Sequence, residues 1–375
     1  MLHGVRRVSR HPSAVPLLPS GRAARATLAP LAALAAGLLG VGVSVPRADA
    51  QPPASAAPAT RAGRVVVDTL RSAALGTRKP FLVYLPPSYD REPARRFPVA
   101  VYLHGLWGNE TNWTRLGQLH LVADSLAAAG APELIVVMPD GDDSWYTTWN
   151  QLVTQAECER PNAWRRGAAE GYCVPWPRYD EYVARDLVAR VDSSYRTIPD
   201  RAHRGIAGLS MGGYGAFALA LRYPEVFSAA HSHSGVVAPL FAGPSPFAPP
   251  ARWATSIDGR RWGVYWTTLP LAFGRDTAGW WARDPSRLAA RLQRERPALM
   301  PALRFDVGTE DGLVTQNRAL HWLFGEMGVA HEYAEAPGAH DFRYWRAHVG
   351  ESLAWLGARL APDGAARAGA GRAGR

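Results

Sequence analysis

Short apolar runs alternate with longer amphipathic segments from about residue 64 to residue 360. Short apolar runs bounded by turn residues are typical of buried strands, whereas apolar positions spaced three and four apart predict helices. The runs predict strands at Arg64–Asp68, Phe81–Leu85, Val99–Leu103, Leu134–Met138, His203–Ala207, Ser228–His233, Leu303–Val307 and His331–Ala334. The amphipathic segments predict helices at Asn112–Ala129, Tyr179–Ser194, Gly213–Tyr223, Pro285–Glu295, Thr315–Met327 and Asp341–Leu360. This alternation predicts an α/β fold with a mostly parallel sheet of about eight strands, flanked by helices.

Two segments interrupt the alternation. Tyr146–Pro177 contains three tryptophans (Trp149, Trp164 and Trp176), and Val237–Trp281 is rich in proline, glycine and tryptophan. Long irregular stretches in a compact domain are usually lids or binding loops. We therefore expect insertions over a site at the strand ends, with surface insertions of no functional role as the alternative.

The first fifty residues have the pattern of a secretion signal. An arginine-bearing start precedes the apolar run Leu28–Val45, and Ala48-Asp49-Ala50 follows as a cleavage motif. A transmembrane anchor is the alternative, but Pro30 and several glycines interrupt the run. The pattern predicts a cleaved signal over 1–50, and hence a secreted or periplasmic protein with no membrane span after cleavage.

The charge of the chain does not indicate a nucleic-acid partner. The formal net charge is +10, but residues 1–50 contribute +5 and residues 361–375 contribute +2, which leaves +3 for the residues between. The basic residues in between form no stripe interleaved with aromatics. Composition also predicts a disordered Pro/Ala linker over 51–63, one folded domain over 64–362 and a disordered Gly/Ala/Arg tail over 363–375.

The chain has two cysteines, Cys158 and Cys173, both in the first insertion. Export to an oxidising compartment favours a disulfide between them, which would contribute about 3 kcal/mol if unstrained. Two free thiols are the alternative. Two cysteines without a nearby His/Cys cluster do not predict a zinc site, and no other metal or cofactor is expected.

The stretch Ile206–Ala216 reads IAGLSMGGYGA and contains the pattern G-x-S-x-G, formed by Gly208, Ser210 and Gly212. An apolar segment precedes it and a small-residue, helix-compatible segment follows. This strand–turn–helix context predicts a nucleophile elbow, in which glycines flank a serine held in a strained backbone conformation. A glycine-rich structural turn is the alternative.

A serine nucleophile needs a base and a carboxylate that orients the base. Asp311 follows the strand predicted at Leu303–Val307, and His340 follows the next predicted strand, so that Ser210, Asp311 and His340 occur in the order that α/β-hydrolases use. Glu310 is the rival carboxylate. Asp341 is expected to cap the final helix instead.

Acyl transfer also requires two backbone N–H groups directed at the developing oxyanion. Met211, directly after the serine, is expected to supply one, and Leu106, in the turn after the third strand, the other. His104 in that turn is expected to support the loop by hydrogen bonding. His231 and His233, at alternate strand positions, are expected to share one face and to be structural.

These motifs resemble the esterase family of α/β-hydrolases that includes esterase D (S-formylglutathione hydrolase), secreted feruloyl and acetyl-xylan esterases, and the secreted mycolyltransferases. The matching segments are Tyr102–Trp113, Val136–Tyr146, Tyr179–Thr197, Ala207–Ala230, Val307–Phe324 and Ala336–Trp345. The resemblance implies an α/β-hydrolase fold, with Ser210 as nucleophile, Asp311 as acid, His340 as base, and Leu106 and Met211 as oxyanion donors. It also implies a cleft lined near Trp145 and Trp345.

Substrate is where the sequence leaves alternatives open. Trp107, Trp113, Trp145 and Trp345 either form an aromatic cleft for an acyl chain, aromatic acid or sugar, or act as packing anchors. Export and the cysteine insertion argue against S-formylglutathione as the substrate. We predict an exported serine carboxylic-ester hydrolase. The alternatives are an acyltransferase that uses a sugar or lipid alcohol, a peptidase or thioesterase, and an inactive carbohydrate-binding member.

Overall fold

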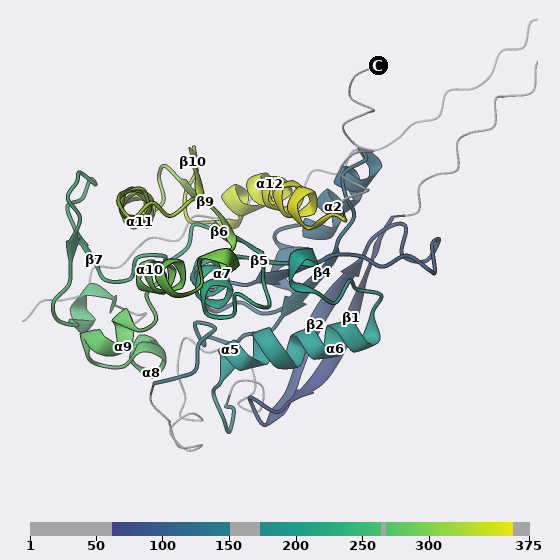
Figure 1. Cartoon of the computed structure of the whole chain (residues 1–375), viewed down its shortest axis with the longest axis horizontal. Coiled ribbons are helices and arrows are strands. Elements are labelled where there is room, and N and C mark those ends of the chain that lie inside the picture. The colour runs from purple at the N-terminus through teal and green to yellow at the C-terminus, as the bar shows by residue number, and fades with distance from the viewer. Residues whose placement is uncertain (1–61, 151–172, 264–267, 363–375) are drawn as a thin grey trace, which may run out of the picture. The chain divides into compact units, whose positions relative to one another are not determined.

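The computed structural model describes residues 62–150, 173–263 and 268–362. An eight-stranded sheet runs through them (Figure 1) in the order β1-β2-β4-β3-β5-β6-β9-β10. Its strands are β1 (Arg64–Ser72), β2 (Thr77–Leu85), β3 (Val99–Leu103), β4 (Ile135–Pro139), β5 (Arg204–Leu209), β6 (Ala229–His233), β9 (Ala302–Gly308) and β10 (Glu332–Ala336). All eight predicted strands are present, with ends shifted by a few residues.

The sheet is antiparallel at one side and parallel over the rest. β2 pairs antiparallel with both β1 and β4, whereas the strands from β4 through β3, β5, β6 and β9 to β10 pair in parallel. Every residue of β3, β4, β5 and β6 is buried. Helices on both faces therefore cover the centre of the sheet, as parallel sheets require. The chain has the α/β-hydrolase fold that the sequence predicted.

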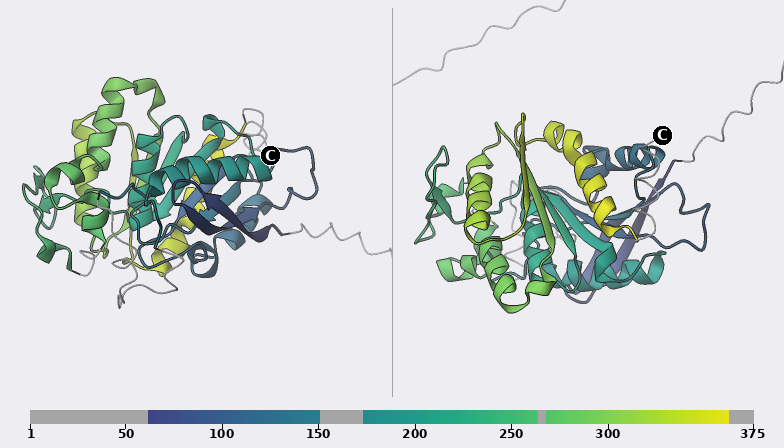
Figure 2. Two further views of the ribbon diagram at one scale, coloured as in Figure 1. Left: turned by 90° about the horizontal axis from the view of Figure 1, so that it is seen from below. Right: turned by 45° about the horizontal axis from the view of Figure 1, so that its top comes forward.

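Two helical layers cover the sheet (Figures 1 and 2). One apolar cluster joins the sheet to α2 (Leu119–Ala128) and α12 (Phe342–Leu360). The cluster on the other face joins it to α7 (Met211–Arg222), α10 (Pro285–Glu295), α11 (Val314–Glu326) and the continuous helical segment α5 (Tyr179–Glu181), η1 (Tyr182–Leu187) and α6 (Val188–Ser194).

The prediction of one continuous helix over Asn112–Ala129 was wrong. The segment Asn112–Ala129 is divided into α1 (Asn112–Arg115) and α2. Gln118 adopts a left-handed conformation between them (φ 52°). A Cβ on the preceding Gly117 would lie 2.8 Å from the Trp113 carbonyl oxygen, so the chain turns tightly against the first helix at this point.

The second insertion, Val237–Trp281, is more ordered than its composition predicted. It contains a small hairpin, β7 (Phe241–Gly243) and β8 (Arg252–Trp253), and the short helices η3 (Gly259–Arg261), α8 (Leu269–Phe273) and α9 (Thr277–Trp281). Trp280 is fully buried, with its ring centroid 5.0 Å from that of Phe273. The expectation of an irregular stretch was wrong, because this segment contributes to the core.

Several predictions fall outside the described residues. These are the signal over 1–50, nearly all of the linker over 51–63, the tail over 363–375 and Cys158. Cys173 is described and is buried. The disulfide therefore stays a prediction. Within the described ranges, no helix combines the length and the hydrophobicity needed to cross a membrane.

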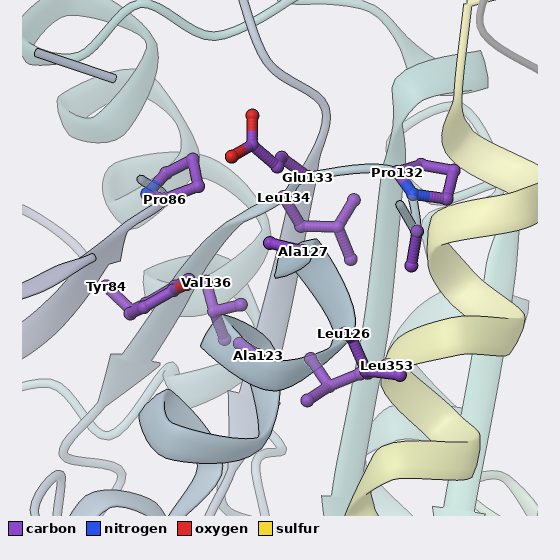
Figure 3. Close-up of a pocket in the computed structure, with 11 residues that line it drawn as sticks. Tyr84, Pro86, Ala123, Leu126, Ala127, Pro132, Glu133, Leu134, Val136 and Leu353 are labelled. Atoms are coloured by element: carbon purple, nitrogen blue, oxygen red, sulfur yellow. The ribbon is translucent and has the colours of Figure 1, made fainter. Parts of the chain in front are cut away.

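A small cavity lies between α2, β4 and α12 (Figure 3). Its apolar lining includes Leu126, Val136 and Leu353, and its volume is about 20 Å³. That volume holds one water molecule and no larger ligand. None of the loops at the carboxyl ends of the parallel strands contributes to its lining, so the cavity is a feature of core packing.

Candidate active site

The topology brings four loops to one edge of the sheet. Parallel strands end at the same edge, and open α/β sheets place their chemistry there. Neighbouring β3 and β5 lead into the Gly105–Leu106 turn and into Ser210, respectively. Neighbouring β9 and β10 lead into Asp311 and His340, so residues far apart in sequence meet at this edge.

Ser210 occupies a strained turn between β5 and α7. Its φ of 53° and ψ of −116° lie outside the regions that L-residues favour. Its N–H donates to the carbonyl of His233 at 2.9 Å, which ties the turn to the neighbouring strand. A Cβ on Gly208 would lie 2.3 Å from the Gly212 carbonyl oxygen, and one on Gly212 would lie 2.5 Å from that of Leu103. The turn therefore requires both glycines of the motif.

Ser210, His340 and Asp311 form a continuous hydrogen-bonded chain. The Ser210 Oγ lies 2.9 Å from His340 Nε2, and His340 Nδ1 lies 2.8 Å from Asp311 Oδ2. The Asp311 side chain is fully buried, while that of His340 is 32% exposed. The chain thus leads from a buried carboxylate to an accessible hydroxyl, as a nucleophile, base and orienting acid require.

A backbone contact holds Asp311, and a side-chain contact holds His340. The second oxygen of Asp311 accepts the Leu313 N–H at 2.7 Å, and the Trp345 ring packs edge-on against His340 with centroids 5.0 Å apart. The side chain of Asp341 caps α12, as predicted, by accepting from the N–H groups of Arg343 and Tyr344. Glu310, the rival carboxylate, is exposed.

The two predicted oxyanion donors lie on either side of the serine. Met211 is the first residue of α7, where an N–H has no acceptor within the helix and the helix dipole favours negative charge. A Cβ on Gly105 would lie 3.4 Å from the Ser210 Cβ, so the turn that carries Leu106 packs directly against the serine. Within the described part of the chain, neither the Leu106 N–H nor the Met211 N–H donates to a protein acceptor.

The four tryptophans of the predicted cleft are placed differently. Trp113 and Trp145 are 1% and 3% exposed, and their indole N–H groups donate to the Leu103 carbonyl and the Thr268 hydroxyl. These contacts argue for packing roles. Trp345 is also buried, against His340, whereas Trp107 is 40% exposed in the turn after β3. Of the four tryptophans, Trp107 is therefore the one whose ring is accessible to solvent.

A buried polar cluster lies behind the site. His231 and His233 stack on one face of β6, as predicted, with ring nitrogens 2.6 and 2.8 Å from Asp306 Oδ2. Ligands of a tetrahedral zinc ion lie roughly 3.3 Å apart, so these distances fit hydrogen bonds and ion pairs rather than a metal centre. Burial, together with the neighbouring His233, lowers the pKa of His231 to about 4.

A second cluster was not anticipated from the sequence. Lys79 Nζ lies 2.8 Å from both Asp140 Oδ2 and Asp142 Oδ1, with its side chain fully buried. Burial and the neighbouring Asp140 raise the pKa of Asp142 to about 6. The signal was present as the single lysine of the chain and the Asp-Gly-Asp-Asp turn after β4, but nothing in the sequence joined them.

The fold is that of the α/β-hydrolases, and the site brings a serine, a histidine and an aspartate into one hydrogen-bonded chain. The family model described as "Putative esterase" matches residues 72–356, and the chain belongs to that esterase family.

Similar proteins identified one by one also carry esterase names. An esterase of Mycobacterium tuberculosis is 27% identical over 284 residues, which are 73% of this chain and 55% of the relative. An acetyl esterase of Caldicellulosiruptor saccharolyticus is 24% identical over 256 residues, 68% of this chain and 81% of the relative. The match thus spans about half the length of the mycobacterial relative.

Solved structures show the same fold. A ferulic acid esterase superposes with a TM-score of 0.60 at 24% identity, covering 80% of this chain and 99% of the other. An S-formylglutathione hydrolase from Agrobacterium tumefaciens superposes with a TM-score of 0.56 at 24% identity, covering 80% of this chain and 96% of that one.

Proposed function

We propose that the protein is an exported carboxylic-ester hydrolase that works through an acyl-enzyme on Ser210. Its Oγ attacks the ester carbonyl while His340 Nε2 takes the hydroxyl proton, and the Met211 and Leu106 amides hold the oxyanion. The intermediate collapses, and the leaving alcohol takes the proton from His340. Water then attacks the acyl-enzyme with His340 again as base, which releases the acid and restores Ser210.

The observation that carries this proposal is the unbroken chain from Asp311 through His340 to the Ser210 Oγ, with contacts of 2.8 and 2.9 Å. Asp311 accepts a hydrogen bond from the Nδ1–H of His340, which leaves the lone pair of Nε2 facing the serine. The strained backbone at Ser210 supports the same role, because such conformations cluster at functional sites.

For the substrate, we propose esters of small or aromatic acids carried by carbohydrate. The names of similar proteins, an acetyl esterase and a ferulic acid esterase, support this class. The exposed Trp107 beside the oxyanion turn supports it too, because an indole face stacks on sugars and aromatic acids. The signal pattern over 1–50 supports action outside the cytoplasm, where a Cys158–Cys173 disulfide forms readily.

A substrate panel tests the proposal. Purified protein is assayed with p-nitrophenyl esters of increasing chain length, methyl ferulate and acetylated xylan, with Ser210→Ala as the blank. We expect turnover of the short p-nitrophenyl esters and of at least one carbohydrate-linked or feruloyl ester. Absence of turnover on every ester would contradict hydrolysis. Acyl-sugar formation in place of free acid, with an added sugar acceptor, would identify an acyltransferase instead.

A further inference from the structure

The direction of the Leu106 N–H is set by the carbonyl of Gly105. These two groups belong to one planar, trans peptide unit, so the N–H points opposite to the C=O. The Gly105 oxygen accepts hydrogen bonds from His104 Nδ1 at 2.8 Å and from the Gly108 N–H at 3.0 Å. The groups that hold the Gly105 oxygen therefore also set the direction of the Leu106 N–H, which is an oxyanion donor in the proposed mechanism.

Two backbone groups hold the His104 ring in one orientation. A carbonyl only accepts, so Nδ1 carries the proton that it shares with Gly105. The Gly141 N–H points at His104 Nε2 at 2.9 Å, and a backbone amide only donates, so Nε2 carries none. The imidazole is 1% exposed, and the Tyr146 hydroxyl donates to the His104 carbonyl at 3.1 Å. The ring thus links Gly141 to Gly105 in a fixed direction.

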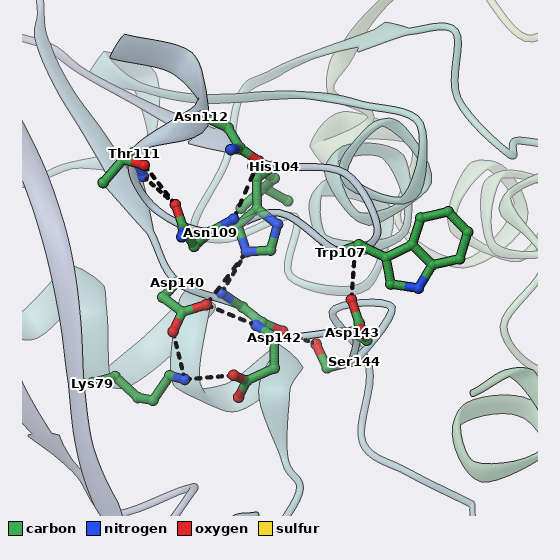
Figure 4. A network of polar contacts seen from close by, with 12 residues as sticks. Lys79, His104, Trp107, Asn109, Thr111, Asn112, Asp140, Asp142, Asp143 and Ser144 are labelled. Atoms are coloured by element: carbon green, nitrogen blue, oxygen red, sulfur yellow. Dashed lines mark hydrogen bonds and ion pairs between the residues drawn. The ribbon is translucent and has the colours of Figure 1, made fainter. Parts of the chain in front are cut away.

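Lys79 anchors the turn in which Gly141 lies, and Figure 4 shows its contacts with Asp140 and Asp142. The ammonium of Lys79, on β2, contacts the carboxylates of Asp140 and Asp142, which flank Gly141, at 2.8 Å each. The Tyr179 hydroxyl donates to the other oxygen of Asp142 at 2.6 Å. Both residues that flank Gly141 are therefore fixed by side chains from other elements.

The use of lysine at this position is itself informative. The chain has 42 basic residues, and all except Lys79 are arginines. A compact ammonium donates in three directions and can join two carboxylates at a point, whereas the guanidinium of arginine is larger and planar. The single lysine thus stands at a fully buried position where one small cation meets two carboxylates.

We propose that Lys79 is a positioning residue for the oxyanion hole. It fixes the Asp140–Asp142 turn, the Gly141 amide fixes His104, and His104 aims the Leu106 N–H. This inference rests on the proposed function, since it assigns Lys79 a part in the same reaction. Lys79 itself touches no reacting atom.

The test compares Lys79→Met with a control that removes another buried cation. Arg204 begins β5, at the end of the strand that lies away from Ser210. It is 5% exposed and pairs with Asp192 at 2.6 Å. Three quantities are measured for each variant: steady-state hydrolysis of p-nitrophenyl acetate, the inhibition constant of phenylboronic acid, and the unfolding temperature. Phenylboronic acid is used because it forms a tetrahedral adduct at the serine.

We expect Lys79→Met to lose about 10- to 100-fold in kcat, less than the 10²–10³-fold cost of a whole oxyanion donor, with KM nearly unchanged. Boronate affinity should fall in parallel. Arg204→Met should lose stability and keep its kcat. An equal loss of kcat in Arg204→Met, or a wild-type kcat in folded Lys79→Met, overturns the inference.

His104 supplies the second half of the test. His104→Leu should lose at least as much kcat as Lys79→Met, while His104→Gln, which keeps a donor and an acceptor, should recover much of it. The double variant Lys79→Met/His104→Leu should be no slower than His104→Leu, because both changes act through one contact. Multiplying losses would show independent effects and overturn the inference.

Two further outcomes are distinguishable. If Lys79→Met does not fold, Tyr179→Phe perturbs the same turn more gently and should lower kcat several-fold; an unchanged kcat there counts against the inference. If the wild-type protein neither hydrolyses esters nor reacts with a fluorophosphonate, the proposed function fails and the inference fails with it. If the wild-type protein hydrolyses esters and the variants keep the wild-type kcat, only the role of Lys79 is overturned and the proposed function stands.

Discussion

Replacement of Asp311 by asparagine is a specific probe of the Ser210–His340–Asp311 chain, because it changes almost no volume. One oxygen of Asp311 accepts the Leu313 N–H at 2.7 Å, and the other faces His340 Nδ1 at 2.8 Å. In Asp311→Asn, the amide oxygen must stay with the Leu313 N–H. The amide NH₂ group is then turned toward Nδ1.

The consequence is a change of tautomer. An NH₂ group donates to Nδ1, so the imidazole proton moves to Nε2. Nε2 faces the Ser210 hydroxyl and, once protonated, cannot accept the hydroxyl proton. The variant also loses the carboxylate that stabilises the imidazolium. Wrong-tautomer substitutions of this kind cost on the order of 10⁴ in kcat, which corresponds to about 5 kcal/mol of transition-state stabilisation.

The assay is steady-state hydrolysis of p-nitrophenyl acetate near pH 8, with circular dichroism to show that the variant folds. Glu310→Gln is the matched control, since it neutralises the adjacent, exposed carboxylate. We expect Asp311→Asn to lose about 10⁴-fold in kcat and Glu310→Gln to stay within about twofold. A folded Asp311→Asn that loses less than about tenfold, or an equal loss in Glu310→Gln, would refute the assignment of the acid.

Four further substitutions test other residues of the site and the fold. His340→Ala should abolish nearly all turnover with an unchanged unfolding temperature, and substantial residual activity would mean that the base is misassigned. Gly212→Ala should lose about 1–3 kcal/mol of stability together with activity, because its Cβ would lie 2.5 Å from the Leu103 oxygen; Gly325→Ala, in open space on α11, should instead gain about 0.5–1 kcal/mol in urea unfolding. Burial raises the pKa of Asp284 from 3.8 to about 6. The native state therefore binds the carboxyl proton of Asp284 more tightly than the unfolded chain does. The free energy of unfolding that this protonation contributes is lost as pH rises through about 6. The neutral Asp284→Asn has no such loss, so its unfolding temperature relative to wild type should rise between about pH 4 and pH 7, and a pH-independent difference would contradict the reasoning.

The sheet was predictable because its central strands are buried on both faces and appear as continuous apolar runs. The break at Gln118 was not predictable, since its left-handed conformation depends on close packing of Gly117 against Trp113. The short helices of Val237–Trp281 were missed for a related reason. Their stability comes from burial of Trp280 and Phe273, and five-residue helices have little periodicity to detect.

The proposed reacting residues were easier to anticipate than the residues that support them. Ser210, Asp311 and His340 each follow a predicted strand in the order that the chemistry requires, and the structure places them in contact. The contact of Lys79 with Asp142 depends on the antiparallel pairing of β2 with β4, which brings together residues 63 positions apart. Likewise, only the packing shows that Trp113 donates to the Leu103 carbonyl instead of facing a cleft.

The proposed mechanism requires Ser210 to be an activated nucleophile. Incubation of the folded protein with a fluorophosphonate, followed by intact-mass and peptide mass spectrometry, tests it most directly, because the reagent leaves a stable adduct only on an activated serine. We expect one adduct per chain, mapped to Ser210, and none in Ser210→Ala. An unlabelled wild-type protein, or an adduct that persists in Ser210→Ala, would contradict it.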